Sequence, residues 1–420
     1  MSRALPVPRQ ALLEVFERRT TRLLSIVVVT GVLGGLVGAA YLGLLELAER
    51  GLGPSHWALL PHLAVLVGVG ALVALLTRWL GRSSDVELLV DDIHVLGGTE
   101  DLRSLRSLIP VSLLCVGAGG ALGPEAPLVT TTGSLGSWIG GRAGLDRDDL
   151  RVVSIAGMAA GFTVLFGAPL GSALFALEIL HRRGLEYYEA LLPAVIGSLC
   201  GYVVYAGTTG LGLEPLFRFP SAIVVRLPDL GWGVLAGVAG AMVAVAFTYL
   251  CLGLRRAIAV VPTSARPVLG GLALGGLAFA TPYALTNGEV QIEHLTTARV
   301  AAGTLLLAAA VKLLASAVTV VSGWKGGFII PLFFIGFCLA QAASPHLPGS
   351  NRWVLAAGFM VACNVGVTKT PIGSTLVVTE MAGMALLPST LIAAVVSLVL
   401  TSSVGLIDSQ RRRLDAEVEP

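Results

Sequence analysis

The sequence has few charged residues. Only 13% of its 420 residues are Asp, Glu, Lys or Arg, about half of the roughly 25% that is usual in soluble globular proteins. Hydrophobic residues make up 55% of the chain, and the mean hydropathy is +0.84. This composition excludes an ordinary soluble enzyme and indicates a polytopic membrane protein.

Neither sign of charge is in clear excess. The chain has 28 Lys and Arg residues against 26 Asp and Glu residues, which gives a formal net charge of +2. A nucleic-acid partner requires a basic face with a strong positive field, and this sequence supplies none. We therefore exclude nucleic acid from the expected partners.

Cysteine is scarce and scattered. Each of the five cysteines stands inside an apolar run, and none has the Cys or His spacing of a metal site. We interpret them as small buried hydrophobic residues and expect no disulfide, no metal and no cofactor. They are Cys115, Cys200, Cys251, Cys338 and Cys363.

The apolar residues form two kinds of stretch. Leu24–Leu45 and Leu60–Leu80 are long enough to cross a hydrocarbon core of about 30 Å at about 1.5 Å per helical residue. Many of the others have only about 12 to 15 residues and are interrupted by Gly and Pro, as is typical of tilted and discontinuous membrane helices. We expect an all-α fold of such helices.

Arginine marks both ends of the apolar region. Five arginines lie in residues 1–22, and Arg411–Arg413 follow the last apolar stretch. The positive-inside tendency then predicts that both termini are cytoplasmic and that the number of full crossings is even. We divide the chain into a lead-in at 1–22, a transmembrane domain at 23–406 and a short tail at 407–420, in a multi-pass protein of the inner or plasma membrane.

The chain contains an internal repeat. Ala168–Leu174 recurs as Thr370–Leu376, and Glu178 is matched by Glu380, all at one offset of 202 residues. A second pair of motifs, around Pro127 and Pro331, recurs at an offset of 204. The repeat divides the transmembrane domain into related halves at about 23–215 and 216–406, and it is compatible with both parallel and inverted halves.

Two glycine-rich segments at matching positions predict helix starts. They are Gly119–Pro127 and Gly323–Pro331. Proline is favoured in the first helical turn, and the free N–H groups of a helix start carry the positive end of its dipole. If two such starts face each other, they form a cradle that attracts an anion with partial charges only. A full positive charge at this place would bind the ion too firmly for transport.

Glu125 is a carboxylate inside this apolar region. Such a group costs several kcal/mol unless it is stabilised, and acids in the membrane are usually functional. Ionised, Glu125 would occupy the place of the anion; protonated, it could swing away, so it could serve as a gate, a proton carrier or both. The alternative is a carboxylate that only caps its own helix.

These motifs resemble those of the CLC family of chloride channels and anion/proton antiporters, from about Leu24 to Leu406. The Gly-Arg-Glu-Gly-Pro signature corresponds to Gly123–Pro127, and the Gly-x-Phe-x-Pro signature corresponds to Gly327–Pro331. The segment Gly167–Glu178 resembles the stretch of the family that faces the dimer interface.

The resemblance implies an inverted-repeat fold and a homodimer with one pore in each subunit, with Glu125 as the gate. The N–H groups of Phe328, Ile329 and Ile330 are then expected to face the ion. The anion-binding residues that it implies are Gly123, Glu125, Ala126, Gly327, Phe328, Ile329 and Ile330.

The sequence departs from the family pattern at several points. Pro124 replaces an arginine and offers no N–H. The family motif whose serine binds the central ion is replaced by Asp85–His94, which resembles the fluoride-exporting branch, as does Pro331–Gly336. Ile407 or Asp408 stands in place of the pore tyrosine. The inner proton-handling glutamate falls at Ile179, which cannot relay a proton, although the fluoride branch also lacks this acid.

Several other polar residues are weaker candidates. We expect Glu178 and Glu380 to cap or pair structurally rather than couple ions, and Lys312 and Lys325 to be interfacial or snorkelling rather than ion ligands. Lys325 could still concentrate anions in a vestibule.

Two further groups are ambiguous. Thr130, Thr131 and Thr132 either supply hydroxyl groups to an ion or pack as small polar residues. Asp91, Asp92 and His94 are metal ligands by type, but they lie in an ordinary polar connection, and we expect no metal there.

The sequence therefore predicts transport of a small inorganic anion, chloride or another halide, that is channel-like or weakly coupled to protons. The alternative is fluoride/proton antiport. An intramembrane enzyme or a receptor-like scaffold is disfavoured, because we find no nucleophile–base pair or metal triad. Ion selectivity, stoichiometry and voltage dependence stay open at this stage.

Overall fold

The computed structural model describes residues 9–81, 90–94, 97–98, 102–181, 187–209, 217, 219, 223–407 and 410. The described residues are largely helical and contain no β-strand. The longer helices are α1 (Arg9–Leu52), α2 (Leu59–Leu80), α4 (Leu105–Gly117), α5 (Glu125–Arg142), α6 (Arg147–Phe166), α7 (Pro169–Glu178), α8 (Leu191–Thr209), α9 (Leu227–Ile258), α10 (Arg266–Ala278), α11 (Glu289–Thr297), α12 (Ala302–Val321), α13 (Ile329–Ala343), α14 (Arg352–Thr368), α15 (Pro371–Ala382) and α16 (Leu387–Thr401).

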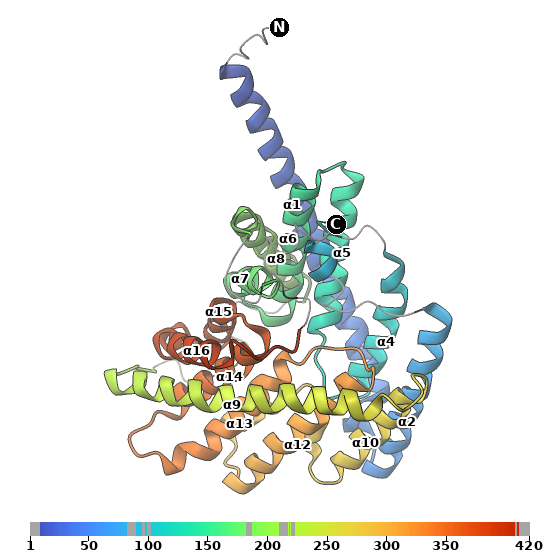
Figure 1. Cartoon of the computed structure of the whole chain (residues 1–420), viewed down its shortest axis with the longest axis vertical. Helices are drawn as coiled ribbons and strands as arrows, with labels where there is room; N and C mark the ends of the chain where they lie inside the picture. The colour runs from blue at the N-terminus through green and yellow to red at the C-terminus, as the bar shows by residue number, and fades with distance from the viewer. Residues whose placement is uncertain are drawn as a thin grey trace.

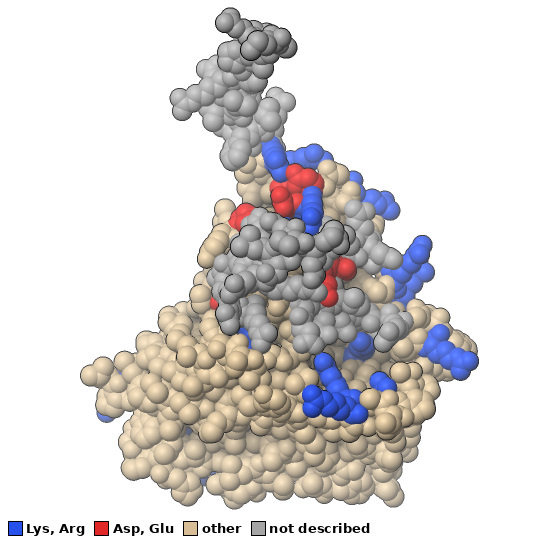
Figure 2. All heavy atoms as spheres, viewed as in Figure 1, with Lys and Arg blue, Asp and Glu red and all other residues tan. Residues whose placement is uncertain are grey.

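Among the described residues, eight helical segments are long and apolar enough to cross a membrane. Others, such as α7 with 10 residues and α15 with 12, are too short to span a bilayer. Most of the broad lower surface in Figure 2 is uncharged, and the acidic side chains gather at the narrower upper end. The expectation of an all-α polytopic membrane protein with discontinuous helices is therefore confirmed.

The first helix is unusually long. Helix α1 runs without a break through 44 residues from Arg9 to Leu52, so the expected boundary between a lead-in and the transmembrane domain, at residue 22, falls inside this helix. Its first turns project beyond the body of the molecule (Figure 1). Arg19 in this helix forms ion pairs of 2.7 and 2.9 Å with Asp146 and Asp149, which lie at the start of α6.

The short helices α7 and α15 occupy equivalent positions in the two halves and pack against each other. The carboxylate of Glu178, the last residue of α7, accepts hydrogen bonds from the N–H groups of Ile372 and Gly373 in the first turn of α15, at 3.1 and 2.7 Å. In return, Glu380 near the end of α15 accepts from Gly171 N–H in the first turn of α7, at 3.3 Å. The two helices are therefore antiparallel, and the halves are inverted relative to each other.

These two glutamates were expected to cap or pair structurally, and the structure confirms capping. Each carboxylate compensates the free N–H groups at the helix start of the other half. The capping is possible because the helices lie very close together: a side chain at Gly171 would collide with the backbone of Val377, and one at Gly373 would collide with Phe175.

Helix ends follow from local sequence. Asp146 accepts from Asp149 N–H at 2.9 Å to start α6, and Asn351 accepts from Trp353 N–H at 3.0 Å to start α14. Two apolar stretches run past the helices within them. The stretch Leu108–Leu122 leaves its helix at Gly117, before the Gly-rich turn, and the stretch Thr390–Leu406 leaves its helix at Thr401.

Candidate anion site

The two glycine-rich segments meet face to face. Gly123 N–H donates to the carbonyl of Gly327 at 2.8 Å, and Gly327 N–H donates to the carbonyl of Gly123 at 2.6 Å. This is an isolated antiparallel bridge between the halves. Directly after it, the first half begins α5 at Glu125 and the second half begins α13 at Ile329. Two helix N-termini are thus brought together in the interior of the protein.

Glu125 lies inside this junction. Its side chain is 1% exposed, and its Oε1 atom accepts a hydrogen bond of 2.7 Å from the N–H group of Ile330 in α13. Its Oε2 atom is buried and has no hydrogen-bond partner. The carboxylate therefore crosses from its own helix to the helix start of the other half, and the alternative in which it only caps its own helix does not describe this geometry.

At the two bridge positions the Glu125 side chain fills the space that a side chain larger than that of glycine would need. A Cβ atom at Gly123 would meet the Cδ, Oε1 and Oε2 atoms of Glu125, and one at Gly327 would meet Oε2, Cδ and Cβ of the same residue. The carboxylate thus fits against bare backbone on both sides.

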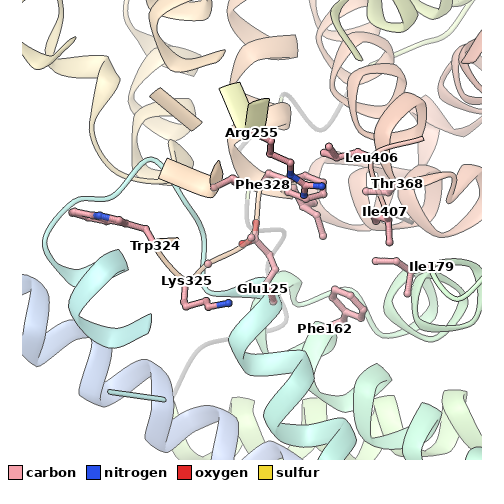
Figure 3. A pocket seen from close by; sticks show the side chains of 15 residues that line it. Glu125, Phe162, Ile179, Arg255, Trp324, Lys325, Phe328, Thr368, Leu406 and Ile407 are labelled. Atoms are coloured by element: carbon pink, nitrogen blue, oxygen red, sulfur yellow. The ribbon is translucent and has the colours of Figure 1, made fainter. Parts of the chain in front are cut away.

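A cavity of about 160 Å³ adjoins Glu125. In Figure 3 the basic side chains of Lys325 and Arg255 lie on either side of Glu125, and Ile179 lies farther away, beyond Phe162. The remaining wall includes Thr368, Leu406 and Ile407. The cavity therefore combines basic residues near the acid with a mainly apolar far end.

The structure brings the predicted anion-binding residues together. Glu125, Ala126, Gly327, Phe328 and Ile329 line the cavity. Gly123 forms the bridge, and Ile330 donates to the carboxylate. Among the three expected N–H groups of this turn, the contact with the acid is made by Ile330.

The departures from the family pattern lie around the same cavity. Pro124 is the residue before the first turn of α5. Ile179 and Ile407 both contribute aliphatic side chains to the wall. Asp408 and the Asp85–Leu89 part of the unusual polar stretch lie outside the described residues.

The expectation that Lys312 is interfacial or snorkelling was wrong. Its side chain, which comes from α12, is fully buried inside the protein and therefore does not snorkel. Its Nζ atom donates to the carbonyls of Leu285 and Thr286, at 2.7 and 2.8 Å, and lies 5.0 Å from the ring centre of Phe334. These carbonyls belong to a loop whose Thr286 N–H donates to Gly119 at 2.8 Å. Lys312 thus supports the Gly-rich turn before Glu125.

Lys325 and the threonines have different surroundings. Lys325 is half-buried and lines the cavity, which is compatible with the vestibule role. Thr131 and Thr132 donate to the backbone carbonyls of Pro127 and Leu128 in their own helix, at 2.7 and 3.0 Å, and no threonine of the 130–132 run lines the cavity. This geometry favours packing over ion binding for Thr131 and Thr132.

His94 is part of a buried aromatic cluster. One ring nitrogen lies 2.8 Å from the hydroxyl of Tyr187, and the other lies 2.8 Å from the carbonyl of Leu180. Within the described part of the chain, no group of three or more His, Cys, Asp or Glu side chains gathers as metal ligands do. All five cysteines are free thiols.

Sequence reasoning missed several residues of the cavity wall. Arg255 comes from the last turn of α9, and Phe162 and Thr368 come from α6 and α14. None stands in a motif around the two helix starts. The one available signal was Arg255 itself, because a basic residue directly after a long apolar run is placed near a membrane surface or a watery cavity.

The fold and this junction define the class of the protein. It is a polytopic membrane protein built from two inverted halves, in which two broken helices meet around a buried acid, as in transporters with a central substrate site.

The model of the voltage gated chloride channel family matches residues 69–402, well over half of the chain. The chain therefore belongs to the voltage gated chloride channel (CLC) family. Among curated proteins, it is 27% identical to a chloride/fluoride channel protein of Pseudomonas syringae pv. tomato over 363 residues, which are 81% of this chain and 76% of that relative.

Two solved structures share the fold. A slow cyanobacterial Cl⁻/H⁺ antiporter matches with a TM-score of 0.80 at 21% identity, covering 91% of this chain and 94% of its own. A CLC-type fluoride/proton antiporter matches with a TM-score of 0.78 at 24% identity, covering 93% of this chain and 98% of its own. These likenesses establish a CLC-type fold.

Proposed function

We propose that this protein moves a small inorganic anion, chloride first, through a pore that Glu125 gates. The observation that carries the proposal is the hydrogen bond between Ile330 N–H and Glu125 Oε1. A carboxylate oxygen here accepts the N–H group that a mobile anion would otherwise accept, at the positive end of the α13 dipole. The acid and the anion thus compete for one place.

Protonation decides the competition. An ionised carboxylate is held by the helix start and excludes an anion through charge and volume. A protonated Glu125 has lost its charge and part of its attraction to the N–H group, so its side chain can leave the cradle. The place beside the Gly123–Gly327 bridge is then free for the transported ion.

The cavity supplies the rest of the pathway. Lys325 and Arg255 line it beside Glu125, and their charges raise the local concentration of anions. Its far end, at Ile179, Leu406 and Ile407, is aliphatic. Apolar walls return little of the hydration energy that an ion gives up. Chloride is larger and less strongly hydrated than fluoride, so this lining favours chloride.

The lining also supports channel-like or weakly coupled transport. Ile179 stands where the resemblance places an inner proton-handling acid, and an aliphatic side chain neither binds nor releases a proton. Glu125 is then the titratable carboxylate of this cavity within the described residues.

Fluoride/proton antiport is the second candidate. It is favoured by a curated relative that is named a chloride/fluoride channel protein and by a structural neighbour that is a fluoride/proton antiporter. Both candidates use the same cradle and the same acid, and they differ in the ion and in the movement of protons.

We also propose a homodimer in the inner or plasma membrane, with both termini cytoplasmic. Leu170 in α7 and Ile372 in α15 are equivalent residues of the two halves, and both are well exposed, at 48% and 41%. Apolar residues of α8 and α16, including Leu199 and Val395, are exposed as well. A second copy that covers this face would bury the paired α7 and α15 helices.

Flux measurements test the function. Purified protein is reconstituted into liposomes that hold chloride or fluoride, and ion-selective electrodes and an internal pH probe follow efflux. We expect chloride efflux with little or no proton movement. Fluoride efflux tied to protons, without chloride efflux, would instead support the antiporter. Absence of efflux for both ions, compared with protein-free liposomes, would contradict anion transport.

A further inference from the structure

A second cavity, of about 260 Å³, shares no lining residue with the one around Glu125. Residues from the connection between α11 and α12, from the end of α13 and from the start of α14 form its wall. Helices α12 and α13 are both candidate membrane spans. The cavity therefore lies at the ends of two candidate membrane spans.

Two guanidinium groups give this cavity its charge. Arg299 and Arg352 both line it, and both are exposed side chains. Neither forms an ion pair with another described residue, and no acidic residue is part of the wall. The guanidinium of Arg352 lies 4.2 Å from the ring centre of Trp353, which limits its freedom.

The wall also contains a buried donor without an acceptor. The side-chain amide nitrogen of Gln341 in α13 is buried and has no hydrogen-bond partner. Such a group costs free energy unless something accepts from it. Together with the two arginines, it makes a cavity that contains several donors and a net positive charge.

The rest of the wall is apolar. Leu295, Val300 and Leu305 line the cavity beside the polar groups. A ligand that satisfies both parts has an anionic head and an apolar body. This combination describes a membrane phospholipid rather than a small hydrated ion.

We propose that this cavity binds the phosphodiester of an anionic membrane lipid. The guanidinium groups of Arg299 and Arg352 donate to the phosphate oxygens, in the paired geometry that suits this group, and the Gln341 amide donates a further hydrogen bond. The glycerol and the first acyl carbons lie against Leu295 and Leu305.

The test uses the full chain in detergent micelles, with the melting temperature and native mass spectrometry as readouts. The probes are phosphatidylglycerol, phosphatidylcholine and inorganic phosphate. The principal variant is Arg299→Gln with Arg352→Gln. The matched control is Arg226→Gln with Arg256→Gln, which removes two exposed charges at the ends of α9.

We expect phosphatidylglycerol to raise the melting temperature of the wild type and to remain bound in the mass spectrometer. Phosphatidylcholine and inorganic phosphate should have much smaller effects. The Arg299/Arg352 variant should bind phosphatidylglycerol about tenfold or more weakly, because it loses the hydrogen bonds between charged groups that hold the phosphate. The control should bind it like the wild type.

Gln341→Met gives an independent measurement. Without lipid this variant should be at least as stable as the wild type, because it removes an unpaired buried amide, yet it should bind phosphatidylglycerol more weakly. Equal phosphatidylglycerol binding by the Arg299/Arg352 variant and its control would overturn the proposal. Inorganic phosphate that stabilises as strongly as the lipid would overturn the lipid as ligand. Both results are independent of anion flux.

Discussion

Gly167 and Lys369 are equivalent residues of the two halves, and both have a left-handed backbone conformation, with φ of 61° and 63°. Gly167 follows α6, and Lys369 follows α14. Glycine adopts this conformation without steric cost, whereas lysine does not. Lysine is nevertheless buried here, and its Nζ atom donates to the carbonyls of Gly366 and Thr401 and to the Thr401 hydroxyl, at 2.5, 2.7 and 2.8 Å.

Lys369→Gly should therefore destabilise the protein although it removes backbone strain. The relief is worth about 1–2 kcal/mol, whereas three hydrogen bonds from a charged donor are worth about 1.5–3 kcal/mol each. The melting temperature measures the net effect. Gly167→Ala, which adds strain in open space, isolates the backbone effect. A rise in melting temperature for Lys369→Gly would refute this reasoning.

Anion flux should increase as the pH falls, because acid protonates Glu125 and removes the charge that holds it in the cradle. Glu125→Gln mimics the neutral acid, so its flux should be high and nearly independent of pH. The exposed Glu293→Gln is the control and should keep the wild-type pH profile. Liposome efflux between about pH 5 and 8 measures this, and an unchanged profile for Glu125→Gln would exclude the gate.

Gly123→Ala should act through Glu125 alone. The three atoms nearest to an added Cβ atom all belong to the Glu125 carboxylate group, so the methyl group should displace the acid from the cradle. We expect Gly123→Ala to raise the flux at high pH. In a protein that already carries Glu125→Ala, adding Gly123→Ala should not change the flux further. Flux assays on the four members of this cycle measure the coupling, and additive effects would contradict the geometry.

Removal of the two interhelix caps should have unequal effects on stability. Glu178 is buried and accepts two hydrogen bonds, whereas Glu380 accepts a longer one and is less buried. Glu178→Ala should cost about 1–3 kcal/mol and Glu380→Ala less. Melting temperatures in detergent provide the comparison, with Glu178→Gln as a milder variant that keeps an acceptor. Equal losses would show that burial does not set the cost.

Lys325→Gln should slow anion entry by a factor that depends on salt. The lysine lines the cavity beside Glu125, so its charge should matter most at low ionic strength and fade as the screening length shortens. Initial efflux rates of the variant and the wild type at about 0.01 M and about 0.3 M salt give the salt dependence of each protein. If the ratio of variant to wild type is constant, Lys325 does not act through its charge.

Much of the fold could be predicted from the sequence, because the repeat indicates two related halves and the short apolar stretches indicate discontinuous helices. The two helix starts before Glu125 and Ile329 could be located from Gly and Pro alone, since these residues determine where a helix begins. The direct contact between the halves could not. It depends on the Gly123–Gly327 bridge and on the carboxylate that crosses to Ile330, and local sequence does not specify a partner about 200 residues away.

The buried lysines show the opposite limit. The pattern placed Lys312 at a membrane surface, because a lone cation in an apolar run usually snorkels. The protein instead provides two carbonyls from a distant loop. Arg255 in the cavity wall was missed for a related reason: the helix that carries it contains no motif, and only the packing of α9 brings it to the cavity.

The reciprocal caps between α7 and α15 make the duplicated halves dependent on each other. Each half contains a helix start with N–H groups that donate to an acid from the other half. Neither α7 nor α15 supplies all the acceptors for the N–H groups of its own first turn. A substitution that weakens one cap therefore leaves N–H groups without an acceptor at a helix start in the other half, so the stabilities of the two halves are coupled.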